Sequence, residues 1–255
     1  MSGDTLDRLF AIRTPEAFEQ RCMDVFRWQA GHCAIYRRYL ELLGRSPSQV
    51  HESRDVPFLP ISFFKTQTVV SGSPDAAAQA VFTSSGTTGS QPSRHHVRDL
   101  RLYERSLTDG FTRFYGAPDG YTILALTPSP LERPDSSLVY MVERLMRQSR
   151  RPDAGFFMRR FDALYQTLRA LRRRRRRTLL IGLTYALLDF AEQRPVDFPS
   201  LIVMETGGMK GTRDELPLDE RRRRLRRGFG SDHIHAEYGM TELLSQAYST
   251  GDGLR

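Results

Sequence analysis

The sequence predicts an α/β fold, in which a largely parallel sheet has helices on both faces. Short apolar runs, each a candidate strand, alternate with helical patterns along the chain. Continuous runs such as Leu179-Leu180-Ile181 are typical of strands that are buried on both faces. We expect strands at residues 80–83, 121–126, 178–183, 201–205 and 233–237.

The first third of the chain is expected to begin with helices. Residues 14–43 repeat apolar side chains at helical spacing, and Thr14 before a proline is a typical helix start. Gly31 is expected to interrupt this helix, and Gly44 to end its second piece. Residues 56–70 contain two prolines, which exclude a long regular helix there. Residues 71–78, rich in small side chains, are predicted to form a loop.

Two later helices follow from apolar stripes between the expected strands. One stripe begins at Leu100 and is closed by Gly116, and the other consists of Leu164, Leu168 and Leu171. We therefore expect residues 1–255 to form one large lobe, in which residues 1–55 are a helical N-terminal segment.

The composition points to a protein of a reducing cytoplasm. No run reaches 18 apolar residues, so no transmembrane helix is expected. The N-terminus is acidic and polar, which argues against a secretory signal. Cys22 and Cys33 lie in helix-like sequence without a partner motif and are interpreted as free thiols.

The net charge of +8 comes mainly from arginine, since Lys65 and Lys210 are the two lysines of the chain. Residues 172–177 and 221–227 are arginine runs, which we interpret as solvated faces and last turns of helices. An alternative is a surface for nucleic acid or anionic lipid. No aromatic residues interleave with the arginines, as a stacking platform would require, so neither nucleic acid nor membrane is predicted as a partner.

Candidate ligand-binding segments follow the expected strands. Ligands of open parallel sheets bind beyond the carboxyl ends of the strands, so residues 83–89, 127–129, 207–208 and 238–242 are expected to meet in one crevice. Residues 83–89 hold five hydroxyl side chains and two glycines, a composition that suits a polyphosphate. The segment lacks the Gly-Lys-Ser/Thr of a Walker A loop.

Four blocks of the sequence resemble one known family. Residues 83–89 are similar to the phosphate loop of the AMP-forming acyl and aryl ligases, and residues 82–96 as a whole resemble the LuxE-type acyl-protein synthetases. Residues 56–65, 131–141 and 237–243 resemble the same synthetases, so that the likeness runs from about residue 56 to the C-terminus.

The resemblance implies a role for each matched residue. Glu242 would help to hold Mg²⁺, Thr241 would hydrogen-bond the α-phosphate, and Tyr238, followed by Gly239, would lie against the adenine. Gly207 and Gly208 would let the adenine approach the backbone closely. Thr88, Thr241 and Glu242 would be the residues nearest the chemistry. The β- and γ-phosphates of ATP would be wrapped by Thr83, Ser84, Ser85, Gly86, Thr87, Thr88 and Gly89.

The implied reaction is attack of a carboxylate, with a fatty acid as the expected substrate, on the α-phosphate of ATP. Family members then pass the acyl group to a cysteine of their C-terminal region, and some supply an acyl-protein or acyl-CoA reductase. They continue well beyond the position of Arg255, so that cysteine, the ribose-binding aspartate and the small C-terminal lobe are expected to be absent from these residues. Arg94 stands where many adenylate-forming enzymes have a lysine.

Several alternatives stay open at this point. The chain is also compatible with a catalytically incomplete ATP-binding protein, or with an acid–thiol ligase of the phenylacetate–CoA ligase kind. Lys65 and Lys210 are either specific phosphate or carboxylate contacts or chance retentions. Residues 131–141 contain apolar side chains that either border the acyl pocket or belong to the core. His235 is expected to be a packed side chain rather than a metal ligand.

Overall fold

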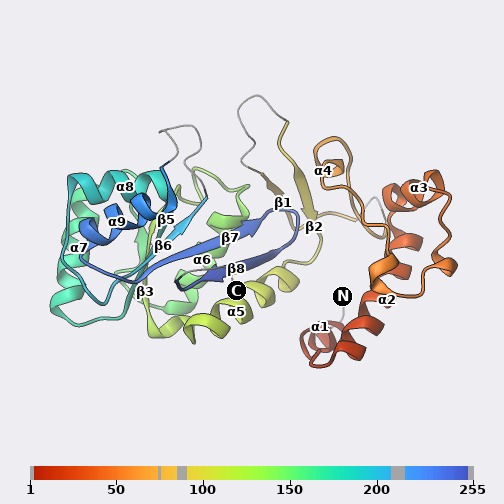
Figure 1. Cartoon of the computed structure of the whole chain (residues 1–255), viewed down its shortest axis with the longest axis horizontal. Helices are drawn as coiled ribbons and strands as arrows, with labels where there is room; N and C mark the ends of the chain where they lie inside the picture. Colours follow the sequence, from red (N-terminus) through yellow and green to blue (C-terminus); the bar gives the residue numbers. More distant parts are fainter. Residues whose placement is uncertain (1–2, 74–75, 85–90, 208–215, 252–255) are drawn as a thin grey trace. The chain divides into compact units, whose positions relative to one another are not determined.

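The chain forms two compact units, Met1–Leu102 and Tyr103–Arg255 (Figure 1). The computed structural model describes residues 3–73, 76–84, 91–207 and 216–251. Of the residues that the sequence assigns to ligand binding, those at 85–89 and 208 lie outside the described residues, as does Lys210. Each unit has its own apolar core.

The N-terminal unit begins with three helices, of which α2 and α3 correspond to the two helical pieces expected in residues 14–43. Thr14 starts α2 because its hydroxyl accepts a hydrogen bond from the amide of Ala17 at 3.2 Å. The helix is interrupted at Cys33, two residues after the expected Gly31, where the backbone becomes extended. Gly44 adopts φ +64° just after α3, a conformation that favours glycine. The elements of this unit are α1 (Gly3–Phe10), α2 (Pro15–His32), α3 (Ala34–Leu42), 3₁₀ turns at Pro47–Gln49 and Ser53–Asp55, α4 (Phe63–Thr66), β1 (Ala80–Thr83) and β2 (Arg94–Val97).

The strand β1 corrects one expectation. Its bounds match the predicted residues 80–83, but it does not belong to the parallel sheet. It pairs antiparallel with β2, from Ala80 opposite Val97 to Thr83 opposite Arg94. β2 was not predicted from the sequence, because Arg94-His95-His96 is polar. A strand of a two-stranded ribbon needs no apolar run.

The C-terminal unit contains a six-stranded sheet in the order β4-β3-β5-β6-β7-β8. All neighbouring pairs are parallel except β7 with β8, which form an antiparallel hairpin at the edge. The strands are β3 (Thr122–Leu126), β4 (Gly155–Phe156), β5 (Thr178–Leu183), β6 (Ile202–Thr206), β7 (Ile234–Met240) and β8 (Ser245–Ser249). The helices are α5 (Leu100–Tyr115), α6 (Ser137–Ser149), α7 (Phe161–Arg173), α8 (Thr184–Gln193) and α9 (Leu218–Phe229), with a 3₁₀ turn at Pro118–Gly120.

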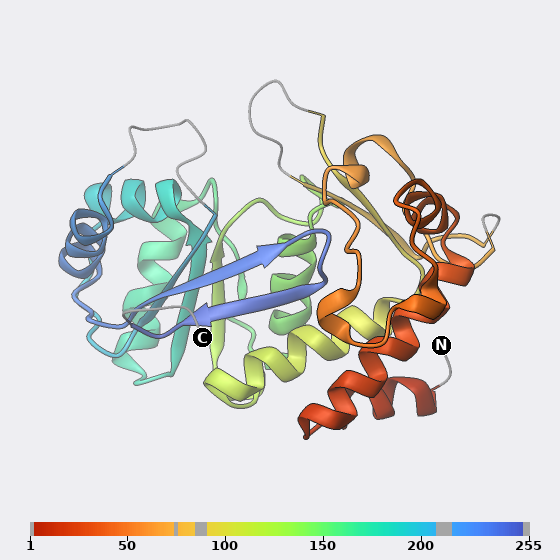
Figure 2. The ribbon, with the colours of Figure 1, turned by 45° about the vertical axis from the view of Figure 1, so that its right-hand side comes forward.

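Helices cover both faces of this sheet, which confirms the predicted fold class (Figure 2). On one face, Leu164, Leu168 and Leu171 of α7 pack with α8, α9 and side chains from β3, β5 and β6. On the other face, the Tyr115 hydroxyl of α5 lies 3.1 Å from Nδ1 of His235, which is buried in β7 as the sequence predicts.

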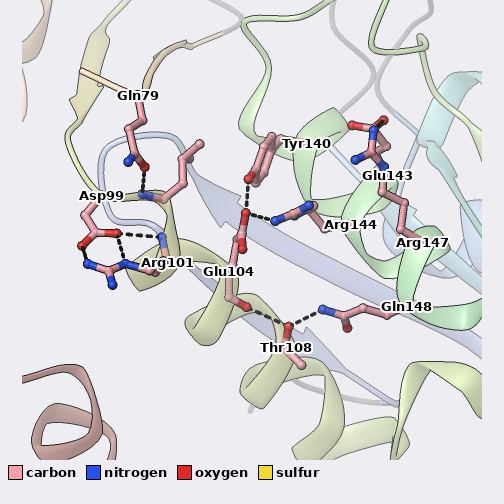
Figure 3. A network of polar contacts seen from close by, with 11 residues as sticks. Gln79, Asp99, Arg101, Glu104, Thr108, Tyr140, Glu143, Arg144, Arg147 and Gln148 are labelled. Carbon is pink, nitrogen blue, oxygen red and sulfur yellow. Dashed lines mark hydrogen bonds and ion pairs between the residues drawn. The ribbon is translucent and has the colours of Figure 1, made fainter. Parts of the chain in front are cut away.

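The two helices α5 and α6 are joined by polar contacts that surround Glu104 (Figure 3). Tyr140 and Arg144 of α6 both donate to the Glu104 carboxylate. One turn further along α5, the Thr108 hydroxyl donates to the Glu104 carbonyl at 2.7 Å and accepts from Gln148 at 2.9 Å. These contacts, from Tyr140 to Gln148, hold most of the length of α6 against α5.

The other predicted strands lie within one residue of their expected starts. The exception in length is β7, which continues to Met240 instead of ending at Glu237. Beyond the parallel sheet it pairs with β8, with Tyr238 opposite Ala247 and Gly239 opposite Gln246. Tyr238 and Gly239 therefore lie inside a strand and not after it. The described part of the chain contains no helix with the length and apolar character needed to cross a bilayer.

Two glycines in helices test how tightly the units are packed. A Cβ added at Gly228 in α9 would lie 2.4 Å from the Cβ of Ala191 in α8, whereas a Cβ at Gly31 in α2 would meet no atom within 4 Å. We expect Gly228→Ala to lower the free energy of unfolding by roughly 1–3 kcal/mol, because α8 and α9 would have to separate. Gly31→Ala is the matched control and is expected to raise it by up to about 1 kcal/mol. Urea unfolding of both variants measures this, and equal effects would contradict the close α8–α9 contact.

Candidate functional site

The carboxyl ends of four parallel strands bring several predicted site residues to one edge of the C-terminal unit. Leu126 of β3 is level with Gly182 of β5, Leu183 of β5 with Thr206 of β6, and Thr206 with Glu237 of β7. The residues that come next in the sequence after these paired residues therefore meet at the same edge of the sheet. Among them are Thr127, Gly207 and Tyr238. Ligands of parallel sheets are expected to bind at this edge.

Gly207 is held at this edge by a hydroxyl from the first residue of α8, just past the neighbouring strand β5. Its φ of +64° favours glycine, and its carbonyl accepts a hydrogen bond from the Thr184 side chain at 2.7 Å. Thr184 is buried and opens α8 directly after β5, so no loop separates strand from helix. The hydrogen bond from the Thr184 side chain thus fixes the backbone of Gly207, the glycine predicted to lie against the adenine.

An ion pair between a buried glutamate and a partly exposed arginine lies beside Gly207 on the face covered by α9. Glu205 is 4% exposed, and its carboxylate lies 2.7 Å from Nε of Arg221 and accepts from the Arg221 Nη2 at 3.2 Å. The two contacts use two nitrogens of one guanidinium, which orients the planar group. The Thr184 hydroxyl also lies 3.5 Å from this carboxylate. Arg221 therefore belongs to the sheet edge and not to a solvated arginine surface.

The next residues along these strands place a second carboxylate on the opposite face. Glu237 is buried beneath α5 and accepts a hydrogen bond from the Thr206 hydroxyl. Burial raises the pKa of Glu237 to about 7, although the Thr206 hydrogen bond lowers it. Burial and, secondarily, the nearby Glu237 also raise the pKa values of Tyr103 and Tyr248.

Gly239 leaves room for this carboxylate. A Cβ at position 239 would lie 2.8 Å from Oε1 of Glu237, two residues earlier on the same face of β7. The packing of Glu237 is therefore one reason for a glycine at position 239. The nucleotide-binding role that the resemblance implies would be another.

The turn between β7 and β8 carries the two residues predicted to act on the α-phosphate and the metal. Thr241 and Glu242 lie in this turn and are half-buried, and the Tyr238 ring that precedes them is 55% exposed. The Thr241 hydroxyl lies 3.4 Å from the hydroxyl of Ser137, the first residue of α6. The turn is thus placed beside a helix N-terminus, where the positive end of the helix dipole favours an anion.

In the N-terminal unit, the predicted phosphate loop begins at the end of a hairpin. The Ser84 amide donates to the Ser93 carbonyl at 3.0 Å, and the Ser93 amide donates to the Ser84 hydroxyl at 2.9 Å. The Ser84 hydroxyl is thus an acceptor in the hairpin. The Phe64 ring of α4 stands edge-on to His95 of β2, with centroids 5.4 Å apart, so Lys65 is carried next to this hairpin.

The two arginine runs are mostly engaged within the protein. Arg177 lies over the Tyr121 ring and donates to its hydroxyl, and Arg172 pairs with Asp197 at 2.6 Å. The other arginines of the runs with partners are Arg174, Arg221, Arg222, Arg223, Arg224 and Arg226. The run at 221–227 lies within α9, as interpreted from the sequence. The run at 172–177 differs, because only Arg172 and Arg173 belong to α7 and the others lie in the turn before β5.

Four residues of this edge were not predicted from the sequence: Thr184, Glu205, Thr206 and Arg221. One signal was present, because Glu205 and Thr206 are polar residues at the end of an otherwise apolar strand. Arg221 had no such signal, since it stands among identical arginines.

Two comparisons with known proteins found no match: no family model matches the sequence, and no curated protein matches it. The fold, in contrast, is similar to that of solved structures of 2-hydroxyisobutyryl-CoA ligase. An open conformation in complex with 2-HIB-AMP and CoA superposes with a TM-score of 0.66 and 17% identity, over 94% of this chain and 54% of the ligase. A postadenylation state in complex with 2-HIB-AMP gives 0.63 and 17%, over 94% and 52%. The chain thus has the fold of an adenylate-forming ligase and spans about half the length of these structures.

The buried Glu237 predicts a pH-dependent stability. Its pKa of about 7 lies above the ordinary 4.5, so the folded protein binds this proton more tightly than the unfolded chain. The resulting stabilisation is complete below pH 4.5 and is lost as the pH rises to about 7. Glu237→Gln keeps an acceptor for Thr206 without titrating, so its free energy of unfolding relative to wild type is expected to rise by on the order of 3 kcal/mol between pH 5 and 8.

Urea unfolding at a series of pH values measures this difference. Glu192→Gln, at a surface position of α8, serves as the control and is expected to show a difference that does not vary with pH. A Glu237→Gln difference that stays constant from pH 5 to 8 would mean that the carboxyl does not retain its proton in the folded protein.

Proposed function

We propose that this chain activates a carboxylic acid with ATP to give an acyl-adenylate and pyrophosphate. The observation that carries the proposal is the edge of the C-terminal unit, where Gly207, the exposed Tyr238 ring and the turn with Thr241 and Glu242 meet. These residues occupy the ligand edge of a fold similar to that of a ligase whose structures contain 2-HIB-AMP.

In the proposed reaction, an oxygen of the acid's carboxylate forms a bond to the α-phosphorus, and the bond from that phosphorus to the bridging oxygen of pyrophosphate breaks. No protein nucleophile is needed, so the protein acts by positioning the reactants and offsetting charge. Thr241 donates a hydrogen bond to an α-phosphate oxygen, and Tyr238 packs on the adenine. Ser84 and the loop residues that follow it bind the β- and γ-phosphates.

Glu242 is suited to a metal shared with phosphate. Within the described residues, no group of three or more His, Cys, Asp or Glu side chains forms a metal cage. A single carboxylate fits Mg²⁺, which usually takes one or two protein carboxylates and completes its shell with phosphate and water. When bound, the ion supplies positive charge to the phosphates, while Glu242 fixes its place at the β7–β8 turn.

The acyl acceptor separates two forms of this proposal. The sequence blocks that resemble the LuxE-type acyl-protein synthetases support a fatty acid as substrate, a protein thiol as acceptor and an acyl reductase as a further partner. The structural similarity to CoA ligases, one of them in complex with CoA, supports CoA as the acceptor instead. Both forms share the adenylation step, so the first test is made on that step.

Acid-dependent exchange of pyrophosphate into ATP, with a panel of fatty and aromatic acids, tests the proposal. Thr241→Ala removes one donor to the transferring phosphate and is expected to lower the exchange rate roughly 100-fold. We expect Glu242→Gln to lower it by a similar factor and to raise the Mg²⁺ concentration needed for half-maximal exchange.

Glu192→Gln is the matched control for the carboxylate-to-amide change, and its exchange rate is expected to equal that of the wild type. ATP binding without exchange for any acid would identify a catalytically incomplete ATP-binding protein and overturn the proposed activity. Exchange that survives in both Thr241→Ala and Glu242→Gln would remove the β7–β8 turn from the mechanism.

A further inference from the structure

The N-terminal unit contains an apolar cavity of about 240 Å³ that the proposed adenylation does not use. It lies between α2, α3 and the segment of residues 56–71. Phe26 and Tyr36 form its helical walls, and Val56, Phe64 and Val69 form the opposite wall. Both cysteines of the chain line it, Cys33 buried and Cys22 half-buried.

The lining determines the chemistry of an occupant. None of the residues that line this cavity carries a charge. The Tyr36 hydroxyl already donates to the Pro57 carbonyl at 2.9 Å, and burial raises the pKa of Tyr36 to about 12, so it stays neutral. Thiols in such a place behave as small apolar groups. The cavity is therefore suited to an uncharged aliphatic or aromatic group.

The mouth of the cavity favours a chain that enters from solvent. Val25 and Phe58 line the cavity and are nevertheless 42% and 71% exposed. Apolar side chains that are exposed around a cavity mark a binding site for an apolar ligand. A cavity of about 150 Å³ holds benzene, so by volume this one holds about ten carbon atoms.

We propose that this cavity binds a linear acyl chain of about ten carbons. The site also communicates with the hairpin that carries the predicted phosphate loop. Phe64, one wall of the cavity, contacts His95 of β2, and His95 lies opposite Phe82 of β1. Phe64 thus connects the cavity to the hairpin one residue pair from its loop end. The site is additional to the adenylation residues of the C-terminal unit.

Cys22 provides a direct readout of occupancy. Because its half-buried thiol lines the cavity, a bound chain is expected to shield it from N-ethylmaleimide. We expect decanoate, below its micelle-forming concentration, to slow the modification of Cys22 at least about 5-fold, measured by peptide mass spectrometry. Butyrate, which is too short to fill the cavity, is expected to leave the rate unchanged.

Two matched variants separate the cavity from general surface effects. Val25→Trp fills the mouth, whereas Leu42→Trp adds the same side chain at a 70% exposed position of α3 outside the cavity. Decanoate protection and the decanoate-induced rise in melting temperature are expected to disappear in Val25→Trp and to persist in Leu42→Trp. Circular dichroism of both variants establishes that they are folded.

A final arm identifies the source of the chain and keeps this proposal distinct from adenylation. Protection by decanoate alone indicates that the free acid binds, and protection that appears only with ATP and Mg²⁺ indicates that the acid binds after the nucleotide. Either result supports the acyl-chain site. Absence of protection and of a melting shift under both conditions, in wild type that performs pyrophosphate exchange, would overturn this inference and leave the proposed function intact.

Discussion

Two carboxylates are buried where the parallel pairing of β6 and β7 ends, and they constrain the candidate site because an uncompensated buried charge is costly. Each is accommodated differently. Glu205 faces α9 and pairs with the guanidinium of Arg221. Glu237 faces α5, where the Thr206 hydroxyl donates to it and burial raises its pKa to about 7. Breaking a buried pair of the first kind would be strongly destabilising. Both arrangements fix β6 and β7 where their parallel pairing ends, next to the residues proposed to bind the ligand.

These constraints change how the glycines of the site are interpreted. Gly207 has a backbone conformation that favours glycine and a carbonyl held by Thr184. Gly239 leaves space that the Glu237 carboxylate fills. A sequence motif can therefore be required twice, once by the ligand and once by the packing that holds the strand. A loss of activity on substituting either glycine would not by itself identify a nucleotide contact, which is why Thr241 and Glu242 are the sharper probes.

The sequence was sufficient to predict the buried strands of the sheet and insufficient to predict the strands at its edges and in the two-stranded ribbon. β3, β5 and β6 are apolar on both faces, so their composition reveals them without knowledge of the fold. β2, β4 and β8 lie at edges or in a ribbon, are short or polar, and exist because a neighbour pairs with them. The same reason explains the error at β1, whose partner β2 carries no apolar signal. The sheet edge at which the candidate site residues gather could be predicted from the topology. The Glu205–Arg221 pair could not, because it depends on how α9 packs.

The arginine content illustrates why charge alone does not identify a partner. A net charge of +8 and two arginine runs are compatible with a surface for polyanions. In the structure, Arg221 is bound to a buried glutamate, Arg177 lies on a tyrosine ring, and Arg172 is held by an aspartate. Arginine can serve all three purposes because its planar guanidinium forms paired hydrogen bonds and stacks on aromatic rings. Six of the twelve arginines in the two runs pair with an acidic side chain in the described part of the chain. The polar groups that indicate a function are instead those that converge at the strand ends.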